Sequence, residues 1–455
     1  MVARHPDHTD TIAAIATPPG QGGVGIVKVS GPDSSRIITA ICKLRPEHRK
    51  CSYTAFHDAH GQVLDRGMAL FFQGPDSHTG EDIAELHGHG GPVVMNMLLQ
   101  RVLSLDARYA RPGEFSERAF LNNKIDLLQA EAVADLIASA SEQAAISAVR
   151  SLEGLFSSLL EGLVNHVTDL RVYVEATLDF PEEEIDPLAE TELPDRLAAC
   201  RGSFADICAR AETGRLLAEG LKIAIIGKPN AGKSSLLNRL AQVERAIVSA
   251  QPGTTRDTIE QQILLDGIPV KVIDTAGIRK AGNRIEQEGI RRARTAAGNA
   301  DVVILIADVN RDEMADLKTI AAQFSPGKNL LYVFNKIDLS GHEPGRPPSS
   351  GETREIFLSA KTGAGIDALK QEIKHCVMAS DYSENTFIAH TRHISVLREA
   401  GAMLEQAAKQ FQRHHAVELF AEDLSRLQQT LSVITGEHTP DDLLGEIFSR
   451  FCIGK

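Results

Sequence analysis

The sequence of 455 residues contains no tryptophan, and aromatic residues make up only 5% of it, so little of the core can be aromatic. Its six cysteines include no Cys-x-x-Cys pair, which argues against a zinc or disulfide framework and favours a reducing compartment. No apolar run approaches the ~20 residues that a membrane helix needs. The first ten residues lack the apolar stretch of a secretory signal. We therefore expect a cytoplasmic protein with no membrane segment.

Basic charge is also scarce. The chain has 48 Lys and Arg against 61 Asp and Glu, and its net charge is −13. This balance argues against a broad nucleic-acid-binding surface, which is usually basic, although local patches remain possible. The length suggests about three domains, at roughly 100–200 residues each.

A phosphate-binding loop lies in the middle of the chain. Residues 227–234 spell Gly-Lys-Pro-Asn-Ala-Gly-Lys-Ser and directly follow the apolar run 221–226, which gives the strand–loop–helix context that such a loop requires. Glycines at both ends of the loop allow backbone N–H groups to surround the phosphates at the start of the next helix. Lys233 is expected to reach the terminal phosphates, and the Ser234 hydroxyl to bind Mg²⁺.

Three further motifs follow in the order that a guanine-nucleotide domain needs. They are Asp274-Thr-Ala-Gly277, Asn335-Lys-Ile-Asp338 and Ser359-Ala-Lys361. Asp338 should accept hydrogen bonds from guanine N1 and the 2-amino group, whereas adenine would leave its carboxylate unpaired. Asn335 and Lys336 should support the base, and Ala360 should donate its N–H to the guanine oxygen. Together the four motifs predict a GTPase.

The switch regions of this GTPase are unusual. Ile278 follows the Asp-Thr-Ala-Gly motif, where Ras-like enzymes have the glutamine that orients the attacking water, and no arginine stands out as a finger. The segment 249–257 is the predicted first switch, with Thr255 as the second hydroxyl on Mg²⁺. Asp274 should hold the metal through a water, and Gly277 should give the γ-phosphate a backbone N–H.

The segments that flank the GTPase motifs differ in pattern. Over residues 11–123, short predicted strands at 11–16, 24–29 and 68–72 alternate with turns rich in Gly and Pro. One helix is predicted in this region from an apolar stripe, which consists of Val93, Val94, Met97, Leu98 and Val102.

Apolar residues recur at helical spacing from about residue 124 to 219 and again from about 386 to 449, with a break before a final helix at 441–450. We therefore predict an α/β P-loop GTPase domain inserted in an all-helical domain, which follows an N-terminal α/β (α+β) domain. The predicted boundaries are 1–123, 124–219, 220–378 and 379–455.

The whole chain resembles a known family. The loop KPNAGKSSLLN, the switch GTTRD and the ending Phe451-Cys-Ile-Gly-Lys455 are similar to those of the MnmE (TrmE) tRNA-modification GTPases. The N-terminal stretches 16–25 and 111–120 fit the same family. The GTPase loops alone would also fit Era or Der, so the two ends of the chain make the resemblance specific.

The resemblance implies that K⁺ supplies the charge that an arginine finger supplies elsewhere. The expected K⁺ ligands are Asn230, Ser249, Gln251 and Thr254. A glutamate of the second switch should orient the water, and its motif position is that of Glu286, with Glu288 as the rival residue.

The residues expected to bind GTP come from the four motifs and the first switch. They are Asn230, Ala231, Gly232, Lys233, Ser234, Ser235, Ser249, Thr254, Thr255, Asp274, Thr275, Ala276, Gly277, Asn335, Lys336, Asp338, Ser359, Ala360 and Lys361. Within this set, Lys233 is also expected to act in catalysis.

For the N-terminal domain the resemblance implies a folate-binding and dimerisation role. The expected ligand is a 5-formyl- or 5,10-methylene-tetrahydrofolate, and its expected binding residues are Lys28, Glu85, Lys124 and Lys455. A carboxylate suits the pterin amino groups and lysines suit the glutamate tail. Cys452 is expected to be needed for tRNA modification. From the residues alone, Cys452 is an incidental thiol at a chain end, and Lys28, Glu85 and Lys124 are ordinary surface charges.

The resemblance also implies partners and a reaction. The partners are a second copy of the chain, an MnmG-like FAD protein that completes a heterotetramer, and tRNA, whose wobble uridine receives an aminomethyl-type group at carbon 5. The alternative is an RNA-remodelling or ribosome-assembly GTPase without modification activity, which would explain the GTPase motifs equally well. The pair His87 and His89 has a spacing compatible with a metal, but no further His or Cys cluster accompanies it.

Overall fold

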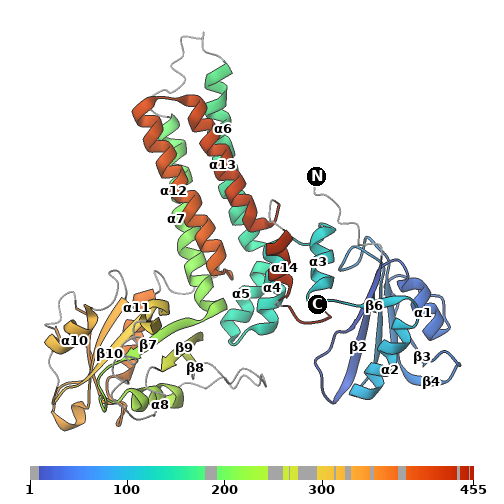
Figure 1. The fold of residues 1–455 in the computed structure, drawn as a ribbon, viewed down its shortest axis with the longest axis horizontal. Helices are drawn as coiled ribbons and strands as arrows, with labels where there is room; N and C mark the ends of the chain where they lie inside the picture. The colour runs from blue at the N-terminus through green and yellow to red at the C-terminus, as the bar shows by residue number, and fades with distance from the viewer. Residues whose placement is uncertain are drawn as a thin grey trace. The chain divides into compact units, whose positions relative to one another are not determined.

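The computed structural model describes residues 10–179, 192–243, 260–265, 267–274, 295–311, 314–322, 329–348, 353–377, 386–437, 441–449 and 451–454 (Figure 1). The chain divides into two compact units. The first unit comprises Met1–Ala134, Leu152–Leu197 and Glu399–Lys455, and the second comprises Asp135–Ser151 and Ala198–Arg398. This division does not test the four predicted domain boundaries, which stay predictions.

A six-stranded sheet forms the N-terminal part of the first unit, in the order β3-β4-β5-β2-β1-β6. Its strands are β1 (Thr11–Ile15), β2 (Gly22–Ser30), β3 (Ser52–His57), β4 (Val63–Phe72), β5 (Ile83–Gly90) and β6 (Ala107–Tyr109). All neighbouring strands are antiparallel except β1 and β6. The domain is therefore of the α+β type, and the strands predicted at its start are confirmed.

Helices α1 (Ser34–Cys42) and α2 (Pro92–Leu103) pack on one face of this sheet. The predicted stripe of α2 was wrong in part, because Val93 and Met97 are 72% and 43% exposed. The buried face consists of Met95, Leu98, Leu99 and Val102. These residues follow the i, i+3, i+4, i+7 spacing of one helix face. The predicted set combined residues of this buried face with residues of the adjacent exposed face.

A buried network of charges attaches α3 (Glu114–Leu121) to the N-terminal sheet. Arg118 is 1% exposed, and its guanidinium donates to Asp10, Glu81 and Glu114 at 2.7–3.2 Å. Arg108 donates to Glu114 from the other side. Burial raises the pKa of Glu114, but hydrogen bonds from Arg108 and the Arg111 backbone, together with the charges of Arg108 and Arg118, outweigh it and lower the pKa to about 2.

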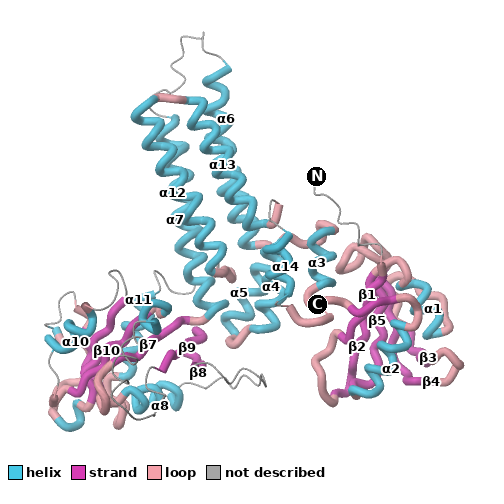
Figure 2. Tube along the Cα trace, viewed as in Figure 1, coloured by secondary structure: helices cyan, strands magenta, loops and turns pink. Residues whose placement is uncertain are grey.

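The helical region uses both flanks of the GTPase segment (Figure 2). Its helices are α4 (Leu127–Ala138), α5 (Glu142–Leu152), α6 (Leu155–Asp179), α7 (Glu192–Glu219), α12 (Thr391–His414), α13 (Val417–Thr435) and α14 (Asp441–Ser449). Helix α6 runs along α13, and Gln428 of α13 donates to Thr168 at 2.6 Å and accepts from Arg171 at 2.9 Å. No helix among the described residues is long and apolar enough to cross a membrane.

The second unit contains a sheet in the order β12-β11-β10-β7-β9-β8, in which only β8 is antiparallel to its neighbour. The strands of this sheet are β7 (Leu221–Ile226), β8 (Glu260–Leu265), β9 (Ile268–Asp274), β10 (Val302–Asp308), β11 (Asn329–Asn335) and β12 (Glu355–Leu358). The described helices that lie between or after these strands include α8 (Lys233–Val243), α10 (Met314–Ala321), η1 (Ile337–Leu339) and α11 (Ile366–Val377).

Each central strand of this sheet is apolar on both faces, as expected of parallel strands covered by helices on both sides. In β7, Ile223 and Ile225 belong to the core cluster with α8 and α11, whereas Ala224 and Ile226 belong to the cluster with α10. Because parallel strands end at the same edge, the loops after β7, β10 and β11 meet there.

The GTPase segment enters and leaves the helical region at one place. Helix α7 ends at Glu219, and Gly220, with φ of +79°, turns the chain into β7. On return, Thr391 begins α12 and donates its N–H and hydroxyl to the Glu219 carboxylate, both at 2.8 Å. The predicted fold class, a GTPase domain inserted between helices and preceded by an α+β domain, is confirmed.

Candidate functional site

The phosphate-binding loop joins Ile226, the last residue of β7, to α8. A side chain at Gly227 would place its Cβ 2.1 Å from the Ile306 carbonyl oxygen, and one at Gly232 would place it 2.1 Å from Asn335 Nδ2. Gly232 also has a φ of +100°. The exposed Asn230 has a φ of +64°, a conformation that asparagine tolerates better than most residues. Close packing and positive φ thus explain the loop sequence.

Lys233 folds back over this loop. Its Nζ donates to the carbonyl oxygens of Gly227 and Lys228 at 2.8 and 2.9 Å. Ser234 and Ser235 follow in the first turn of α8 and are exposed. The lysine amine and the serine hydroxyls therefore lie at a helix N-terminus, which favours anions.

Asn335 connects the phosphate loop to the loop of Ser359, Ala360 and Lys361, which is called the base loop because the sequence predicts that it contacts guanine. The Asn335 side chain is 2% exposed; its Nδ2 donates to the Ala231 carbonyl at 2.9 Å, and its Oδ1 accepts from the Ala360 N–H at 3.0 Å. One amide thus satisfies buried backbone groups of two motifs that lie far apart in sequence. Because the Ala360 N–H already donates to Asn335, a guanine oxygen would have to share or displace that hydrogen bond.

Asp338 is exposed and oriented by the base loop. The buried Ser359 donates its hydroxyl to Asp338 Oδ1 at 2.7 Å. A serine donor on one carboxylate oxygen fixes the plane of the carboxylate and leaves the second oxygen for a ligand. The exposed Lys361 ends the same loop.

Two residues at this site were missed by the sequence analysis. Arg239 of α8 donates its Nε to the Ala360 carbonyl at 3.0 Å and a second nitrogen to the Lys361 carbonyl, so it holds the base loop from the phosphate side. Asp308 ends β10 and pairs with Lys336 at 2.7 Å. A sequence signal existed only for Asp308, since it is a single charge directly after the apolar run 302–307.

Lys28 and Glu85 of the N-terminal sheet lie directly opposite each other on β2 and β5. The Lys28 Nζ lies 5.0 Å from the centre of the buried Phe115 ring, a cation–π geometry, and Glu85 pairs with His87 at 2.9 Å. Lys124 is exposed, and its stem lies 3.4 Å from the position that a Cβ on Gly80 would take. The structure therefore brings Lys28 and Glu85 together, with His87 as an additional neighbour.

The C-terminal tail passes against the N-terminal domain of the same chain. The Gly113 N–H donates to the Cys452 carbonyl at 3.4 Å. Gly454 has a φ of +94°, and a Cβ there would lie 2.8 Å from Ala16 Cα at the end of β1. Phe451 is buried with α4 and α14, whereas Cys452 is exposed. The exposed Cys452 thus lies two residues before the glycine that packs against the end of β1.

Comparisons with known proteins agree with this geometry. A family model described as "GTP-binding protein TrmE N-terminus" matches residues 11–124, and one described as "MnmE helical domain" matches residues 127–452. A "tRNA modification GTPase MnmE" of Pseudomonas aeruginosa is 50% identical, over 98% of this chain and 99% of its own. That of Chromobacterium violaceum is 48% identical, over 98% of both. The chain belongs to the MnmE family.

Two solved structures illustrate a more distant similarity to part of this chain. The FeoB G-domain from Methanococcus jannaschii is 29% identical and covers 34% of this MnmE-family chain and 96% of its own, with a TM-score of 0.26. Aquifex aeolicus Era bound to GDP and aluminium fluoride is 24% identical and covers 40% and 65%, with a TM-score of 0.27. These similarities add nothing to the MnmE membership.

Several predicted site residues of this MnmE-family chain lie outside the described residues. They are Ser249, Gln251, Thr254, Thr255, Thr275, Ala276, Gly277, Glu286 and Lys455. Of the Asp-Thr-Ala-Gly motif, the structure describes the backbone of Asp274, which ends β9 as predicted.

The His87 and His89 pair makes no metal site in the described part of this MnmE-family chain. His87 pairs with Glu85, whereas His89 pairs with Asp65 through Nδ1 at 2.7 Å. Among the described residues, no group of three or more His, Cys, Asp and Glu side chains could hold a metal ion.

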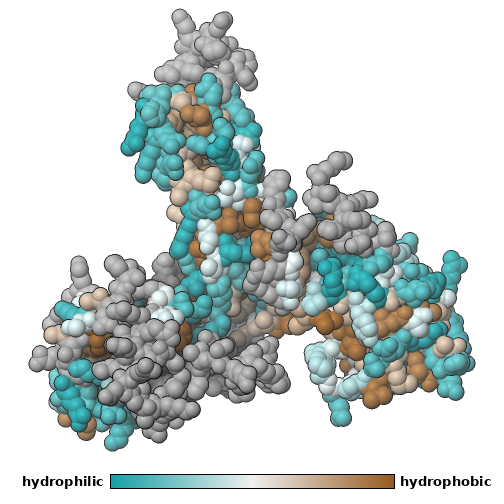
Figure 3. Space-filling model, viewed as in Figure 1, coloured by the Kyte–Doolittle hydropathy of each residue, from teal (hydrophilic) through white to brown (hydrophobic). Residues whose placement is uncertain are grey.

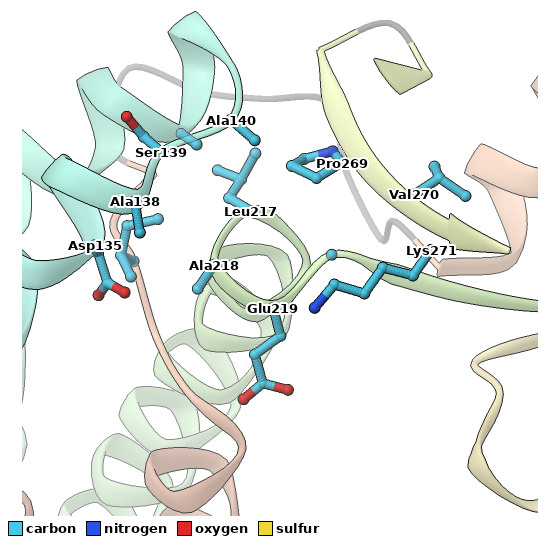
Figure 4. Close-up of a pocket in the computed structure, with 13 residues that line it drawn as sticks. Asp135, Ala138, Ser139, Ala140, Leu217, Ala218, Glu219, Pro269, Val270 and Lys271 are labelled. Carbon is cyan, nitrogen blue, oxygen red and sulfur yellow. The ribbon is translucent and has the colours of Figure 1, made fainter. Parts of the chain in front are cut away.

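A cavity of about 240 Å³ lies where α4, the end of α7 and β9 meet in this MnmE-family chain (Figure 4). Asp135, Glu219 and Lys271 are among its lining residues. Its two carboxylates already have partners, because Asp135 pairs with His390 at 3.0 Å and Glu219 accepts from Thr391. We therefore assign this cavity to the junction of the inserted segment rather than to a ligand.

Proposed function

We propose that this GTPase of tRNA modification is activated by K⁺ and that, with an FAD-dependent partner, it adds an aminomethyl-type group to carbon 5 of the wobble uridine of certain tRNAs. The nucleotide-binding part of this proposal rests on the two hydrogen bonds of Asn335, which join the phosphate loop to the base loop. With both loops attached to one buried amide, the distance between the phosphate and base subsites is fixed before a ligand arrives, which lowers the entropic cost of binding.

The donors of the proposed site fit GTP with Mg²⁺. Lys233 and the N-terminus of α8 would neutralise the phosphates, and the exposed Ser234 would place a hydroxyl on the metal. Asp338, oriented by Ser359, would accept from guanine N1 and the 2-amino group. Thr255 and Asp274 would complete the metal site, and bound Mg²⁺ would offset charge on the terminal phosphates.

The K⁺ part of the proposal depends on Asn230, which is exposed at the turn of the phosphate loop. Ser249, Gln251 and Thr254 would supply the other oxygens, and Glu286 would orient the water. GTP hydrolysis should be far faster in K⁺ than in Na⁺, because a loop built for the larger ion would not close on the smaller one. Asn230→Ala should remove the difference and leave GDP affinity largely intact. Equal rates in the two salts would contradict the K⁺ proposal.

For the N-terminal domain we propose a folate site and a homodimer. Lys28 and Glu85 present a cation and a carboxylate side by side. The carboxylate would accept hydrogen bonds from the pterin amino groups, and Lys28, Lys124 and Lys455 would supply positive charge for the glutamate tail. Tyr53 and Met68 are cross-strand neighbours that are 73% and 51% exposed, on a domain with much apolar surface (Figure 3). Such apolar exposure is typical of an interface.

For the reaction we propose that Cys452 is needed for modification of the tRNA and not for GTP hydrolysis. A 5-formyl- or 5,10-methylene-tetrahydrofolate would supply the one-carbon unit, and glycine or ammonium the amine. The MnmG-like FAD protein would complete a heterotetramer, and the reaction would take place in the cytoplasm. GTP hydrolysis would drive a conformational switch rather than the bond-forming step itself.

Wobble-uridine modification of unmodified tRNA, assayed with and without an MnmG-like protein, tests this proposal. We expect the modified nucleoside only when both proteins, GTP, K⁺, a methylene-tetrahydrofolate and an amine donor are present. GTP hydrolysis without any change in the tRNA under these conditions would instead support an RNA-remodelling or ribosome-assembly GTPase. Folate binding by the full-length protein, measured by calorimetry, gives a second and independent readout.

A further inference from the structure

Asp308 and Lys336 come together because two parallel strands end in register. Asp308 is the partner of Asn335 in the pairing of β10 with β11, and the Val309 N–H donates to the Asn335 carbonyl at 3.0 Å. Lys336 follows with a φ of +70°, a backbone conformation that few lysines adopt. The end of β10 therefore lies directly beside Asn335 and Lys336.

The Asp308 carboxylate is nearly enclosed, and both of its oxygens are occupied. Its side chain is 8% exposed; Oδ2 accepts from Lys336 Nζ at 2.7 Å, and Oδ1 accepts from the Asn310 N–H at 3.1 Å. Arg311 approaches only to 3.8 Å and is 77% exposed. Burial raises the pKa of Asp308, but the hydrogen bonds from Lys336 and Asn310 and the Lys336 charge outweigh it and lower the pKa, so the Asp308 carboxylate is charged at neutral pH.

The ion pair with Asp308 fixes the Lys336 side chain, which would otherwise lose conformational entropy on binding. Lysine has many rotamers, and immobilising such a side chain on binding opposes affinity. With Nζ attached to Asp308, the stem of Lys336 is already held next to Asn335 and Asp338, the residues that we propose to contact guanine. Asp308 itself lies on the neighbouring strand, outside the four motifs.

We propose that Asp308 is a positioning residue for guanine nucleotides, which acts by holding Lys336 in its base-supporting conformation. The inference rests on the proposed GTP site and adds to it a residue that contributes to affinity and not to hydrolysis. Because Lys336 belongs to the base subsite, the effect should be equal for GDP and GTP.

The test is a double-mutant cycle on the full-length protein, with Kd measured by fluorescence of N-methylanthraniloyl-GDP. Asp308→Asn and Lys336→Ala should each raise Kd by about 2- to 10-fold, the first because Lys336 must then be ordered on binding and the second because its support of the base is lost. The double variant should be no weaker than the weaker single variant, since Asp308 acts through Lys336. At saturating GTP, kcat of Asp308→Asn should stay within about twofold of wild type, which a general loosening of the fold would not produce.

The matched control is Asp301→Asn, at the opposite end of β10. Like Asp308, Asp301 pairs with a basic side chain, in this case the partially buried Arg215 at 2.8 Å. This change should leave Kd unchanged. Asp308→Glu keeps a carboxylate near Nζ and should restore affinity, and Asp308→Ser replaces Asp308→Asn in the cycle if thermal unfolding shows that the amide variant does not fold.

Each adverse outcome is distinct. A wild-type Kd for Asp308→Asn, or effects of the two single changes that add in the double variant, would overturn the role of Asp308. Failure of the wild-type protein to bind the fluorescent GDP would instead overturn the proposed nucleotide site.

Discussion

The proposed guanine site and the proposed folate site around Lys28 and Glu85 are built in different ways. In the guanine site, the proposed contact groups are fixed by one another: Asn335 holds Ala231 and Ala360, and Ser359 orients Asp338. In the N-terminal site, Lys28 and Glu85 meet through strand register, and their described partners, Phe115 and His87, lie outside the set predicted to bind folate.

This difference indicates how much each site depends on further parts. The described guanine groups come from strand ends of one sheet, so the loops of one segment supply them. The N-terminal sheet provides one charged pair, and the tail that carries Cys452 reaches the end of β1 from the other end of the chain. We therefore expect nucleotide chemistry to tolerate changes in the tail and tRNA modification to fail with them.

The largest expected effect comes from Cys452→Ser. Modification of tRNA should be abolished, because an alcohol lacks thiolate reactivity, while GTP hydrolysis should be unchanged. The swap nearly preserves size at an exposed position, so folding should be unaffected. The matched control is Cys51→Ser, at another exposed cysteine, which should spare both activities. If Cys452→Ser modifies tRNA at the normal rate, then the thiol is not needed for tRNA modification, and the proposed role of the C-terminal tail is wrong.

The next largest effect is expected from Glu286→Ala in the second switch. GTP affinity should hardly change, but kcat should fall by roughly 10²–10⁴, the range for loss of a positioned acid–base group. Steady-state hydrolysis in K⁺, with Glu288→Ala as the control, separates the two glutamates. A larger loss with Glu288→Ala would show that Glu286 is the wrong residue.

A smaller effect concerns stability of the N-terminal domain. At pH 7, Glu114→Gln should destabilise it by about 3 kcal/mol, since Arg108 and Arg118 lose a buried partner. Hydrogen exchange of the β1 and α3 amides measures this locally. Because folding lowers the pKa of Glu114 from 4.5 to about 2, its contribution is present above pH 4.5 and is lost as pH falls from 4.5 through 2.

The acid dependence makes that prediction specific. Glu114→Gln should flatten the loss of protection between pH 4.5 and 2. Glu117→Gln, on the same helix with an exposed arginine partner, should cost less than about 1 kcal/mol. An equal effect of the two substitutions would argue against the buried network.

The parts of the fold and site that the sequence predicted share one property. The phosphate loop follows β7, Asn335 ends β11 and Asp338 lies shortly after it, so the predicted chemistry stands at the end of an apolar run. Arg239 carries no such signal, because its role depends on α8 packing beside a loop far along the chain. His87 was noticed for the wrong reason, since its spacing to His89 suggested a metal and its partner is Glu85.

The buried face of α2 illustrates the same limit at the level of packing. Val93 and Met97 are as apolar as the buried residues, and only the sheet beneath the helix determines which stripe is covered. The insertion of the GTPase segment was predictable from helical periodicity on both flanks. The hydrogen bond from Thr391 to Glu219 was not predictable, because it joins two helix ends that are separated in sequence by the whole inserted segment.

Base preference in Asp338→Asn is the most direct test of the proposed guanine site. We propose that Asp338, which Ser359 orients, selects guanine. Exchange of the carboxylate for an amide replaces an acceptor pair with one acceptor and one donor, which suits xanthine better. GTP affinity should fall by about 10- to 100-fold and XTP affinity should rise. Unchanged GTP affinity with no gain for XTP would contradict the assignment of this edge of the sheet as the guanine site.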